Sequence, residues 1–419
     1  MVLSLGNNHL HGELPEGIFR FPYLQKLKIT NYFPYGSLEV NFPKANWSSP
    51  LRSLELSFVN LARELSLLSS IGNLRFLEVL DLFSCNLKGS IPESFGNLTR
   101  LTYLDLSYNS IIGLLPSSFS NFKQLRYLDL SANQLHGQIA RAFGNLTKLF
   151  YLSLRRNQFS GQLRFSVFDL ANIVYLDLSG NFLSGRIPPW LFTLPSLFVL
   201  HLNDNKFTGP IDQFEQPSAS LEYVDLKNNE INGPIPSSVF ALVNLTYLDL
   251  SSNMLTGISE PNNLSKLNKL EILDLSNNAL LSFKSGSKAN YIMAPNLSVL
   301  KLSTCNISEF PYFVGTLEGL EHLDLSCNKI RVIEADMFSK LKNLSWLDLS
   351  LNSQISLSTS TDVSLFFPNL RSLSCSSCNI SEFSDFVRNL EGLEYLDLSY
   401  NRINVIETYV FKAQESHVA

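Results

Sequence analysis

Aspartates recur at a fixed spacing along this chain, and they are the residues whose type most suggests chemical work. Paired carboxylates are the groups that glycosidases use as general acid and nucleophile. These aspartates all stand at one position of a repeated pattern, namely Asp105, Asp129, Asp177, Asp225, Asp249, Asp274, Asp324, Asp348 and Asp397. A residue that returns with every repeat belongs to the repeat itself and not to a catalytic pair. We therefore predict no catalytic residue and no enzymatic activity.

Histidines and cysteines indicate no other reaction. None of the six histidines stands at a spacing to serine, cysteine or acid that suggests a triad. Cys375 and Cys378 form a C-x-x-C pair, but no second pair and no nearby histidine completes a zinc site. Cys85, Cys305 and Cys378 instead stand where the pattern has asparagine, and a small polar side chain is enough there. We predict no metal site, no cofactor and no disulfide framework.

The elements that carry these residues follow a period of about 24 residues. Leu101, Leu104, Leu106, Asn109 and Gly113 are followed by the same residue types one period later, and again after that. The pattern resembles the leucine-rich-repeat signature, L-x-x-L-x-L-x-x-N/C-x-L. Because a solenoid grows by stacking, its length does not require several domains. We predict one solenoid of about seventeen repeats over residues 1–411, with the first and last repeats incomplete, and a non-repeat tail at 412–419.

Each repeat is expected to begin with a short strand at x-L-x-L. Alternation points Leu104 and Leu106 inward and Tyr103 and Asp105 to the opposite face. Successive strands then pair in parallel about 4.8 Å apart and build one long concave sheet. The asparagine turns the chain, and its amide satisfies backbone groups of the turn. The rest of the repeat returns on the convex side as short 3-10 or irregular segments, since so few residues leave no room for long helices.

A second motif, L-x-G-x-I-P, refines the fold class. It reads LKGSIP at 87–92, LSGRIP at 183–188 and INGPIP at 231–236, and it disappears from position 257 onward. These repeats resemble the plant-specific leucine-rich repeats. The phrases GNLTRLTYLDLSYN (96–109) and FSKLKNLSWLDLS (338–350) are similar to plant receptor-like proteins of the disease-resistance type. The resemblance implies the ectodomain of a cell-surface receptor that has no kinase and signals through a partner receptor kinase.

Departures from the repeat pattern on the concave face indicate a candidate contact surface. Tyrosine recurs before the second leucine, and stacked tyrosines are good recognition anchors. Basic residues replace serine or aspartate nearby, and such a group suits an anionic or peptide carboxylate. The predicted ligand-binding residues are Tyr151, Arg155, Tyr175, His201, Tyr223 and Lys227. The alternative is that the tyrosines are repeat consensus and the basic residues only offset the aspartates.

Acceptor sequons for N-glycosylation favour the extracellular side of the plasma membrane. The predicted glycosylation sites are Asn46, Asn97, Asn145, Asn244, Asn263, Asn296 and Asn343. Asn306 and Asn379 are sequons beside the asparagine turn and are expected to be modified less. A net charge of -5 without a basic run argues against nucleic acid as a partner. Because the chain has no signal-peptide pattern and no membrane-spanning apolar run, we expect it to be part of a longer surface protein.

These observations predict a non-enzymatic recognition module that senses a peptide, protein or glycan signal in defence. One alternative is a piece of a leucine-rich-repeat receptor kinase, which has the same fold. A second is a secreted inhibitor of cell-wall hydrolases, although such arrays are shorter and carry cysteine caps. A third is a fragment without function that misfolds for want of its end caps.

Overall fold

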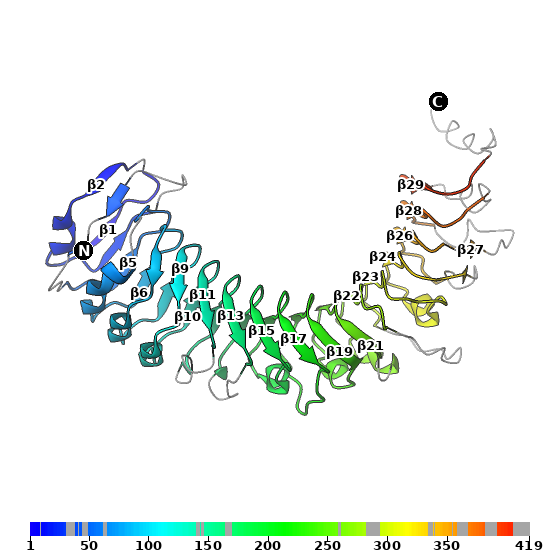
Figure 1. The fold of residues 1–419 in the computed structure, drawn as a ribbon, viewed down its shortest axis with the longest axis horizontal. Helices are drawn as coiled ribbons and strands as arrows, with labels where there is room; N and C mark the ends of the chain where they lie inside the picture. Colours follow the sequence, from blue (N-terminus) through cyan, green and yellow to red (C-terminus); the bar gives the residue numbers. More distant parts are fainter. Residues whose placement is uncertain are drawn as a thin grey trace. The chain divides into compact units, whose positions relative to one another are not determined.

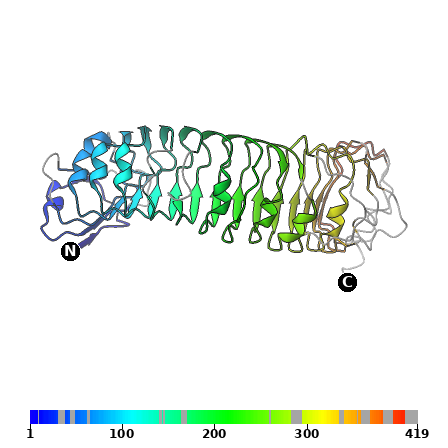
Figure 2. The same cartoon turned by 90° about the horizontal axis from the view of Figure 1, so that it is seen from below.

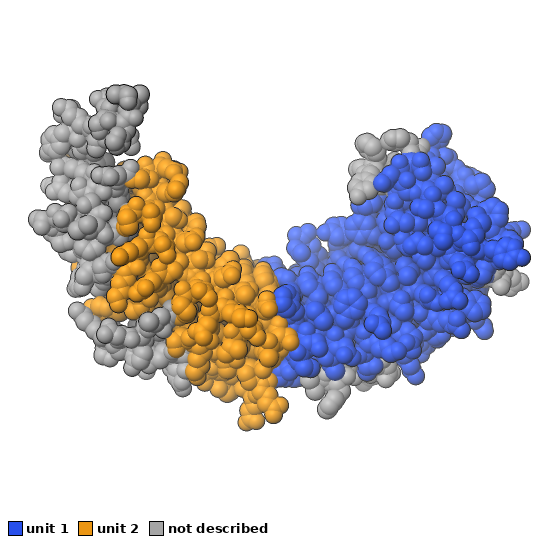
Figure 3. Space-filling model, turned by 180° about the vertical axis from the view of Figure 1, so that it is seen from behind, with its two compact units in different colours: residues 1–208 blue, residues 209–419 orange. Residues whose placement is uncertain are grey.

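The computed structural model forms two compact units, residues 1–208 and residues 209–419 (Figure 3). The residues it describes are 1–8, 10–30, 38–40, 42–43, 49–61, 65–139, 143, 146–163, 170–258, 261–281, 294–333, 338, 340–353, 355–357, 368–381 and 392–404. The predicted tail at 412–419 lies outside them, and the single solenoid domain over 1–411 stays a prediction. Each unit contains one short parallel strand per repeat, as the leucine pattern predicts (Figure 1).

The first unit contains nine of these strands, here called its main sheet. In sheet order they are β1 (Val2–Ser4), β3 (Lys26–Lys28), β5 (Ser53–Glu55), β6 (Val79–Asp81), β8 (Tyr103–Asp105), β10 (Tyr127–Asp129), β12 (Tyr151–Ser153), β14 (Tyr175–Asp177) and β16 (Val199–His201). Neighbours pair without a shift of register, so that equivalent residues of successive repeats lie side by side.

The second unit repeats this arrangement with eight strands. They are β18 (Tyr223–Asp225), β20 (Tyr247–Asp249), β22 (Ile272–Asp274), β23 (Val299–Lys301), β24 (His322–Asp324), β26 (Trp346–Asp348), β28 (Ser372–Ser374) and β29 (Tyr395–Asp397). Pairing is again parallel and in register.

The core of each unit is a stack of leucines. Leu101, Leu104 and Leu106 are fully buried, and the equivalent residues of the neighbouring repeats are buried too. Phenylalanines such as Phe95 and Phe119 fill the space opposite the strands. Burying one such side chain contributes roughly 1.5–3 kcal/mol. One repeat cannot bury its leucines alone, so each depends on the repeats on either side.

The asparagine ladder fastens each repeat to the one before it. Asn157 Nδ2 donates to the carbonyl oxygen of Leu130 at 2.9 Å and to that of Leu154 at 3.1 Å. Its Oδ1 accepts from the backbone N–H of Leu135 at 3.0 Å. The same bonds recur at Asn133 and Asn181. The predicted role of this side chain in the turn is confirmed.

A second parallel sheet in the first unit is a feature that the sequence reading missed. It pairs β7 (Lys88–Ser90), β9 (Ser110–Gly113), β11 (Gln134–Gly137), β13 (Gln158–Gly161), β15 (Phe182–Gly185) and β17 (Lys206–Gly209). In the second unit β19 (Glu230–Ile235) pairs with β21 (Met254–Ile258). These strands cover the stretch that carries L-x-G-x-I-P. The glycine is needed because Gly185 has φ 79°, and a Cβ there would lie 2.8 Å from Gln162 Cγ.

Short 3-10 helices follow in many of the repeats, including several that carry a strand of the second sheet, as predicted for the convex side. In the first unit they are η1 (Glu16–Arg20), η2 (Leu65–Asn73), η3 (Glu93–Asn97), η4 (Ser117–Asn121) and η6 (Pro189–Thr193). In the second unit they are η7 (Val239–Ala241), η8 (Pro261–Lys266) and η9 (Tyr312–Thr316). Figure 2 shows the blue and cyan coils of the first unit stacked in a row. The proline before η3, η6 and η9 is extended and marks where each helix begins.

Candidate functional site

The outward face of the first unit's main sheet carries a continuous stack of tyrosine rings. Tyr103, Tyr127, Tyr151 and Tyr175 lie in register on β8, β10, β12 and β14. Successive ring centroids are 4.3, 4.2 and 4.6 Å apart, and the planes lie within 9° of parallel. The rings are half-buried. The predicted aromatic ladder is therefore present in this unit, and it presents a rigid surface because each inner ring is held from both sides.

A row of carboxylates runs beside the tyrosines. Asp105 Oδ1 accepts hydrogen bonds from the Ser107 hydroxyl at 2.6 Å and from the Ser107 backbone N–H at 2.9 Å, while the Tyr103 hydroxyl donates to its Oδ2 at 3.4 Å. Burial raises the pKa of Asp105 to about 7; the Ser107 bonds oppose this shift, and the neighbouring carboxylates of Asp129 and Asp81 add to it. Burial raises the pKa of those two aspartates as well.

The repeat of β12 interrupts this row. Where its neighbours have a hydrogen-bonded Asp and Ser, such as Asp177 with Ser179, it has Ser153 and Arg155. The Arg155 side chain is exposed, and its positive charge lowers the pKa of Tyr175 against the larger effect of burial, which raises it. Arg155 forms no ion pair within the part of the chain that the structure describes. The repeat of β12 thus has no carboxylate of its own at this position for Arg155 to pair with, and the nearest aspartates of the row belong to the neighbouring repeats.

The six predicted ligand-binding residues fall into two groups. Tyr151, Arg155, Tyr175 and His201 belong to the first unit, where the imidazole of His201 lies 5.9 Å from the Tyr175 ring, centroid to centroid, at 58°. His201 stands opposite Asp177 in the register of β14 and β16.

The second group, Tyr223 and Lys227, belongs to the second unit. Tyr223 stacks on Tyr247 at 4.1 Å with the planes 2° from parallel. Lys227 is exposed, and its backbone N–H donates to Asp225 Oδ1 at 3.0 Å. Asp225 is retained here, so Lys227 has a carboxylate in its own repeat, unlike Arg155.

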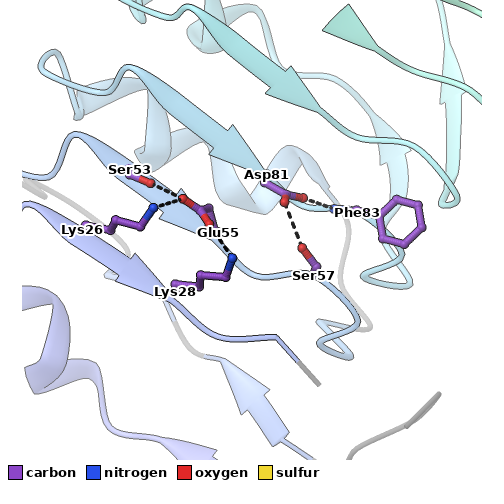
Figure 4. A network of polar contacts seen from close by, with 7 residues as sticks. All are labelled: Lys26, Lys28, Ser53, Glu55, Ser57, Asp81 and Phe83. Carbon is purple, nitrogen blue, oxygen red and sulfur yellow. Dashed lines mark hydrogen bonds and ion pairs between the residues drawn. The ribbon is translucent and has the colours of Figure 1, made fainter. Parts of the chain in front are cut away.

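A charged cluster at the start of the first unit was not found from the sequence. Figure 4 shows Lys26 and Lys28 on β3 reaching Glu55 on β5, with Nζ–Oε distances of 2.6 and 3.3 Å. Ser53 Oγ also donates to Glu55 at 2.7 Å. Burial raises the pKa of Glu55, but the hydrogen bonds and charge of Lys26, with those of Ser53 and Lys28, outweigh it and lower the pKa. The sequence does contain a signal for this cluster, because Lys26 and Lys28 stand at the positions where later repeats have tyrosine and aspartate.

Aromatic residues border the same face, and these too were missed. Phe83 packs edge-on against Phe58 at 4.9 Å and against Tyr108 at 5.3 Å between ring centroids. Phe58 and Tyr108 have φ of 59° and 55°, a left-handed conformation that costs roughly 1–2 kcal/mol in a non-glycine residue. The equivalent turn position also has a positive φ in other repeats, where the residues are varied and include Ala132, Arg156 and Leu351 as well as the better tolerated Gly180 and Asn228.

Two of the cysteines take the place of the ladder asparagine, as their position in the repeat predicts. The Sγ of Cys305 donates to the carbonyl oxygen of Leu275 at 3.2 Å, and the Sγ of Cys378 donates to that of Leu349 at 3.1 Å. These bonds replace the hydrogen bond that the asparagine Nδ2 makes in other repeats. All five cysteines are free. No group of three or more His, Cys, Asp or Glu among the described residues could hold a metal ion. Within the same residues, no helix is long and apolar enough to cross a membrane.

Four of the predicted glycosylation sites can be located. Asn97, Asn296 and Asn343 are exposed, and Asn244 is partly exposed. Nδ2 of Asn244, Asn296 and Asn343 donates to a carbonyl oxygen of the preceding repeat, at 2.6 to 3.1 Å. A glycosylated amide keeps one N–H, so these bonds are compatible with modification. Asn46 and Asn145 lie outside the described residues, and Asn263 lies in η8 with its side chain outside the description.

Comparison with known families agrees with this architecture. A leucine-rich-repeat family model matches residues 75–135, 114–159, 219–280 and 295–353, and a second one matches residues 172–194. Together these matches cover more than half of the chain. The chain belongs to the leucine-rich-repeat family.

Sequence relatives narrow the type of leucine-rich repeat. Receptor like protein 22 of Arabidopsis thaliana is 44% identical over 88 residues, which are 21% of this chain and 11% of that protein. Receptor-like protein 32 of the same plant is 33% identical over 144 residues, 33% of this chain and 17% of the relative. The matches thus span less than a fifth of those relatives. This leucine-rich-repeat chain is of the plant receptor-like-protein ectodomain type.

Solved structures of leucine-rich-repeat proteins share its fold. The Arabidopsis receptor kinase HAESA, in complex with the peptide hormone IDA and the co-receptor SERK1, is 30% identical with a TM-score of 0.70, over 95% of this chain and 70% of that chain. A Leptospira interrogans leucine-rich-repeat protein is 27% identical with a TM-score of 0.67, over 84% of this chain and 85% of that one. The fold alone therefore extends beyond plants.

Proposed function

We propose that this chain is a non-catalytic recognition module of a plant cell-surface receptor-like protein and that it binds a peptide on the outward face of its main sheet. The observation that carries the proposal is the replacement of an Asp–Ser pair by Ser153 and Arg155 beside an unbroken tyrosine stack. The rings offer flat apolar edges already fixed in place, which lowers the ordering cost of binding. Arg155 offers a bidentate partner for a carboxylate.

The similarity to a peptide-hormone receptor supports a peptide over a glycan or a folded protein as the ligand. We further propose that the intact protein lies on the extracellular side of the plasma membrane, serves defence signalling, and acts with a partner kinase. These three points rest on the resemblance to receptor-like proteins, whose full length this chain does not span.

A panel of synthetic peptides tests the peptide-carboxylate proposal directly. Each peptide is prepared with a free C-terminal carboxylate and as its amide, and binding to the secreted full chain is measured by calorimetry. We expect at least one carboxylate form to bind ten times more tightly than its amide. Arg155→Ala should remove that difference. The proposal would be contradicted if the carboxylate and amide forms of every peptide bound equally, or if a difference in affinity remained in the Arg155→Ala variant.

A further inference from the structure

One flank of the first unit carries three exposed apolar side chains in consecutive repeats. Phe150, Val174 and Phe198 each stand directly before a main-sheet strand, β12, β14 and β16 respectively, and are 42%, 39% and 43% exposed. We call these three residues the flank strip. The same position in the three preceding repeats is polar, with Glu78, Thr102 and Arg126.

The flank strip is continuous. The backbone N–H of Val174 donates to the Phe150 carbonyl oxygen at 2.8 Å, and that of Phe198 donates to the Val174 carbonyl oxygen at the same distance. Adjacent strands lie about 4.8 Å apart, so the three side chains follow one another at that spacing. Single exposed apolar residues are ordinary, but a contiguous group rimmed by polar residues marks a contact surface.

The same flank is basic on the side of the preceding repeats. The segments that lead into the strands, 99–102, 123–126, 147–150, 171–174 and 195–198, contain no acidic residue. Their basic side chains are all exposed: Arg100, Lys123, Arg126 and Lys148. The chain as a whole is acidic, with a net charge of -5, so the positive charge is a local property of this flank.

None of these charges is neutralised by a carboxylate in the described part of the chain. Lys148 Nζ donates to Gln124 Oε1 at 2.6 Å, and the Arg100 guanidinium lies over the Phe76 ring at 5.1 Å. Arg126 makes no ion pair there. An acidic partner would therefore not have to displace an internal salt bridge.

We propose that this flank of the first unit docks an acidic amphipathic helix of a protein partner. An α-helix places side chains at i, i+3 or i+4, and i+7 along one line, about 5.4 Å per turn, which matches the spacing between repeats. A strand repeats a face every two residues, roughly 6.6 Å, and fits less well. Apolar residues at one end of the helix cover the flank strip, and carboxylates at the other end face Arg126 and Lys148.

A designed helical peptide tests this surface. The probe has about 18 residues, or roughly 27 Å of helix, with three leucines on one face of one half and three glutamates on the same face of the other half. A scrambled peptide of equal composition is the control. We expect saturable binding to the full chain that weakens with added salt, and no binding of the scrambled peptide.

Variants locate the binding. Phe150→Ser, and separately Arg126→Glu with Lys148→Glu, should each weaken the probe at least tenfold. Val243→Ser removes an exposed apolar side chain of the second unit and should have no effect. Thermal melting checks that every variant is folded. Arg155→Ala should also leave the probe's affinity unchanged, which separates this surface from the proposed peptide site.

Three outcomes would overturn the proposal. The first is equal binding of the probe and the scrambled peptide. The second is a set of folded flank variants that bind the probe normally. The third is reversible self-association of the chain in sedimentation experiments that Phe150→Ser abolishes, since the occupant of the strip would then be a second copy of the chain.

Discussion

The rings of Tyr127 and Tyr151 stack 4.2 Å apart, with their planes 9° from parallel. This contact joins two successive repeats through side chains on the outward face, opposite the leucine core. Tyr151 has a second such partner in Tyr175. Each aromatic pair contributes about 0.5–1.5 kcal/mol beyond its buried area. A ligand that rests on these rings thus meets a surface whose order is already maintained by folding.

Removing one ring from the middle of this stack should weaken folding, whereas removing its hydroxyl should not. We expect Tyr151→Ala to lower the free energy of unfolding by about 1–3 kcal/mol, because two ring contacts are lost. Tyr151→Phe keeps both contacts and should lie within about 0.5 kcal/mol of the parent. Urea unfolding followed by circular dichroism measures both, with exposed Gln158→Ala as control. Equal losses for the Ala and Phe variants would contradict a role for stacking.

Arg155 and Lys227 should differ in their contribution to binding a peptide carboxylate. Arg155→Ala is expected to cost about 2 kcal/mol, or roughly thirtyfold in Kd. Lys227→Ala should cost less, because Asp225 remains beside Lys227 and opposes an anion. Calorimetric titration with a peptide that binds in its carboxylate form measures the Kd of the two variants. Lys88→Ala, an exposed residue of the second sheet, serves as the control. A larger loss at Lys227 would reverse our assignment of the anchor.

The asparagine ladder predicts that loss of a single asparagine side chain strongly destabilises its own turn. Asn157→Ala removes bonds to the carbonyl oxygens of Leu130 and Leu154 and leaves the Leu135 N–H without its acceptor. Leaving such buried groups unsatisfied costs about 1–3 kcal/mol each. Hydrogen exchange should accelerate at Leu135 more than at amides several repeats away. Uniform acceleration along the whole unit would show that the loss is global and not confined to the turn.

The raised pKa of Asp105 predicts that stability falls as pH rises. Its folded pKa of about 7 lies above the ordinary value of 3.8, so the folded state holds the proton more tightly between these two values. The stabilisation from this group is fully present below pH 4 and is lost as the pH rises through 7, with a slope of at most about 1.4 kcal/mol per pH unit. Asp105→Asn should flatten this dependence of the unfolding free energy.

Asp397 provides a matched control for that experiment. It occupies the same repeat position but is less buried than Asp105, and hydrogen bonds from Ser399 lower its pKa. Asp397 therefore contributes to the pH dependence of stability with the opposite sign, because its stabilising contribution is lost as the pH falls through its lowered pKa. Asp397→Asn should therefore leave the decline between pH 4 and 7 intact. A decline that persists in Asp105→Asn would assign it to other groups of the row.

Exposure and backbone conformation together predict which sequons carry glycan after secretion from plant cells. Asn97, Asn296 and Asn343 are exposed and should be modified. Asn306 and Asn379 have φ of 57° and 60° beside the asparagine turn and should be modified less. Mass mapping of tryptic peptides gives the occupancy, with Asn→Gln variants as controls. If all of these sites were bare on secreted protein, the extracellular proposal would lose its main support.

Much of the fold could be predicted because the period itself determines it. The burial of Leu104 and the turn at Asn157 follow from their places in the repeat. The register of the strands follows from the leucine pattern, and it is kept although the repeats differ in length, as in Tyr127 with Tyr151 and Ile272 with Val299. The second sheet was missed because its hydrogen bonds join different repeats, whereas the L-x-G-x-I-P motif describes residues within one repeat. The clusters around Glu55 and Phe83 were missed for a related reason: each joins side chains from successive repeats that do not match the consensus.

The asparagine bond to the preceding repeat restricts how such an array can change in length. The donor lies 27 residues after its acceptor in Asn157 with Leu130, 28 residues after it in Asn278 with Leu250 and 26 in Asn328 with Leu302. A repeat can therefore gain or lose a single residue and keep this bond, whereas a large insertion or deletion within a repeat would separate the pair. Gain or loss of a whole repeat recreates the same pair. The sequence contains a trace of such an event, because residues 378–411 closely repeat residues 305–338. New recognition surfaces can therefore arise here by copying whole repeats and then altering only their outward side chains.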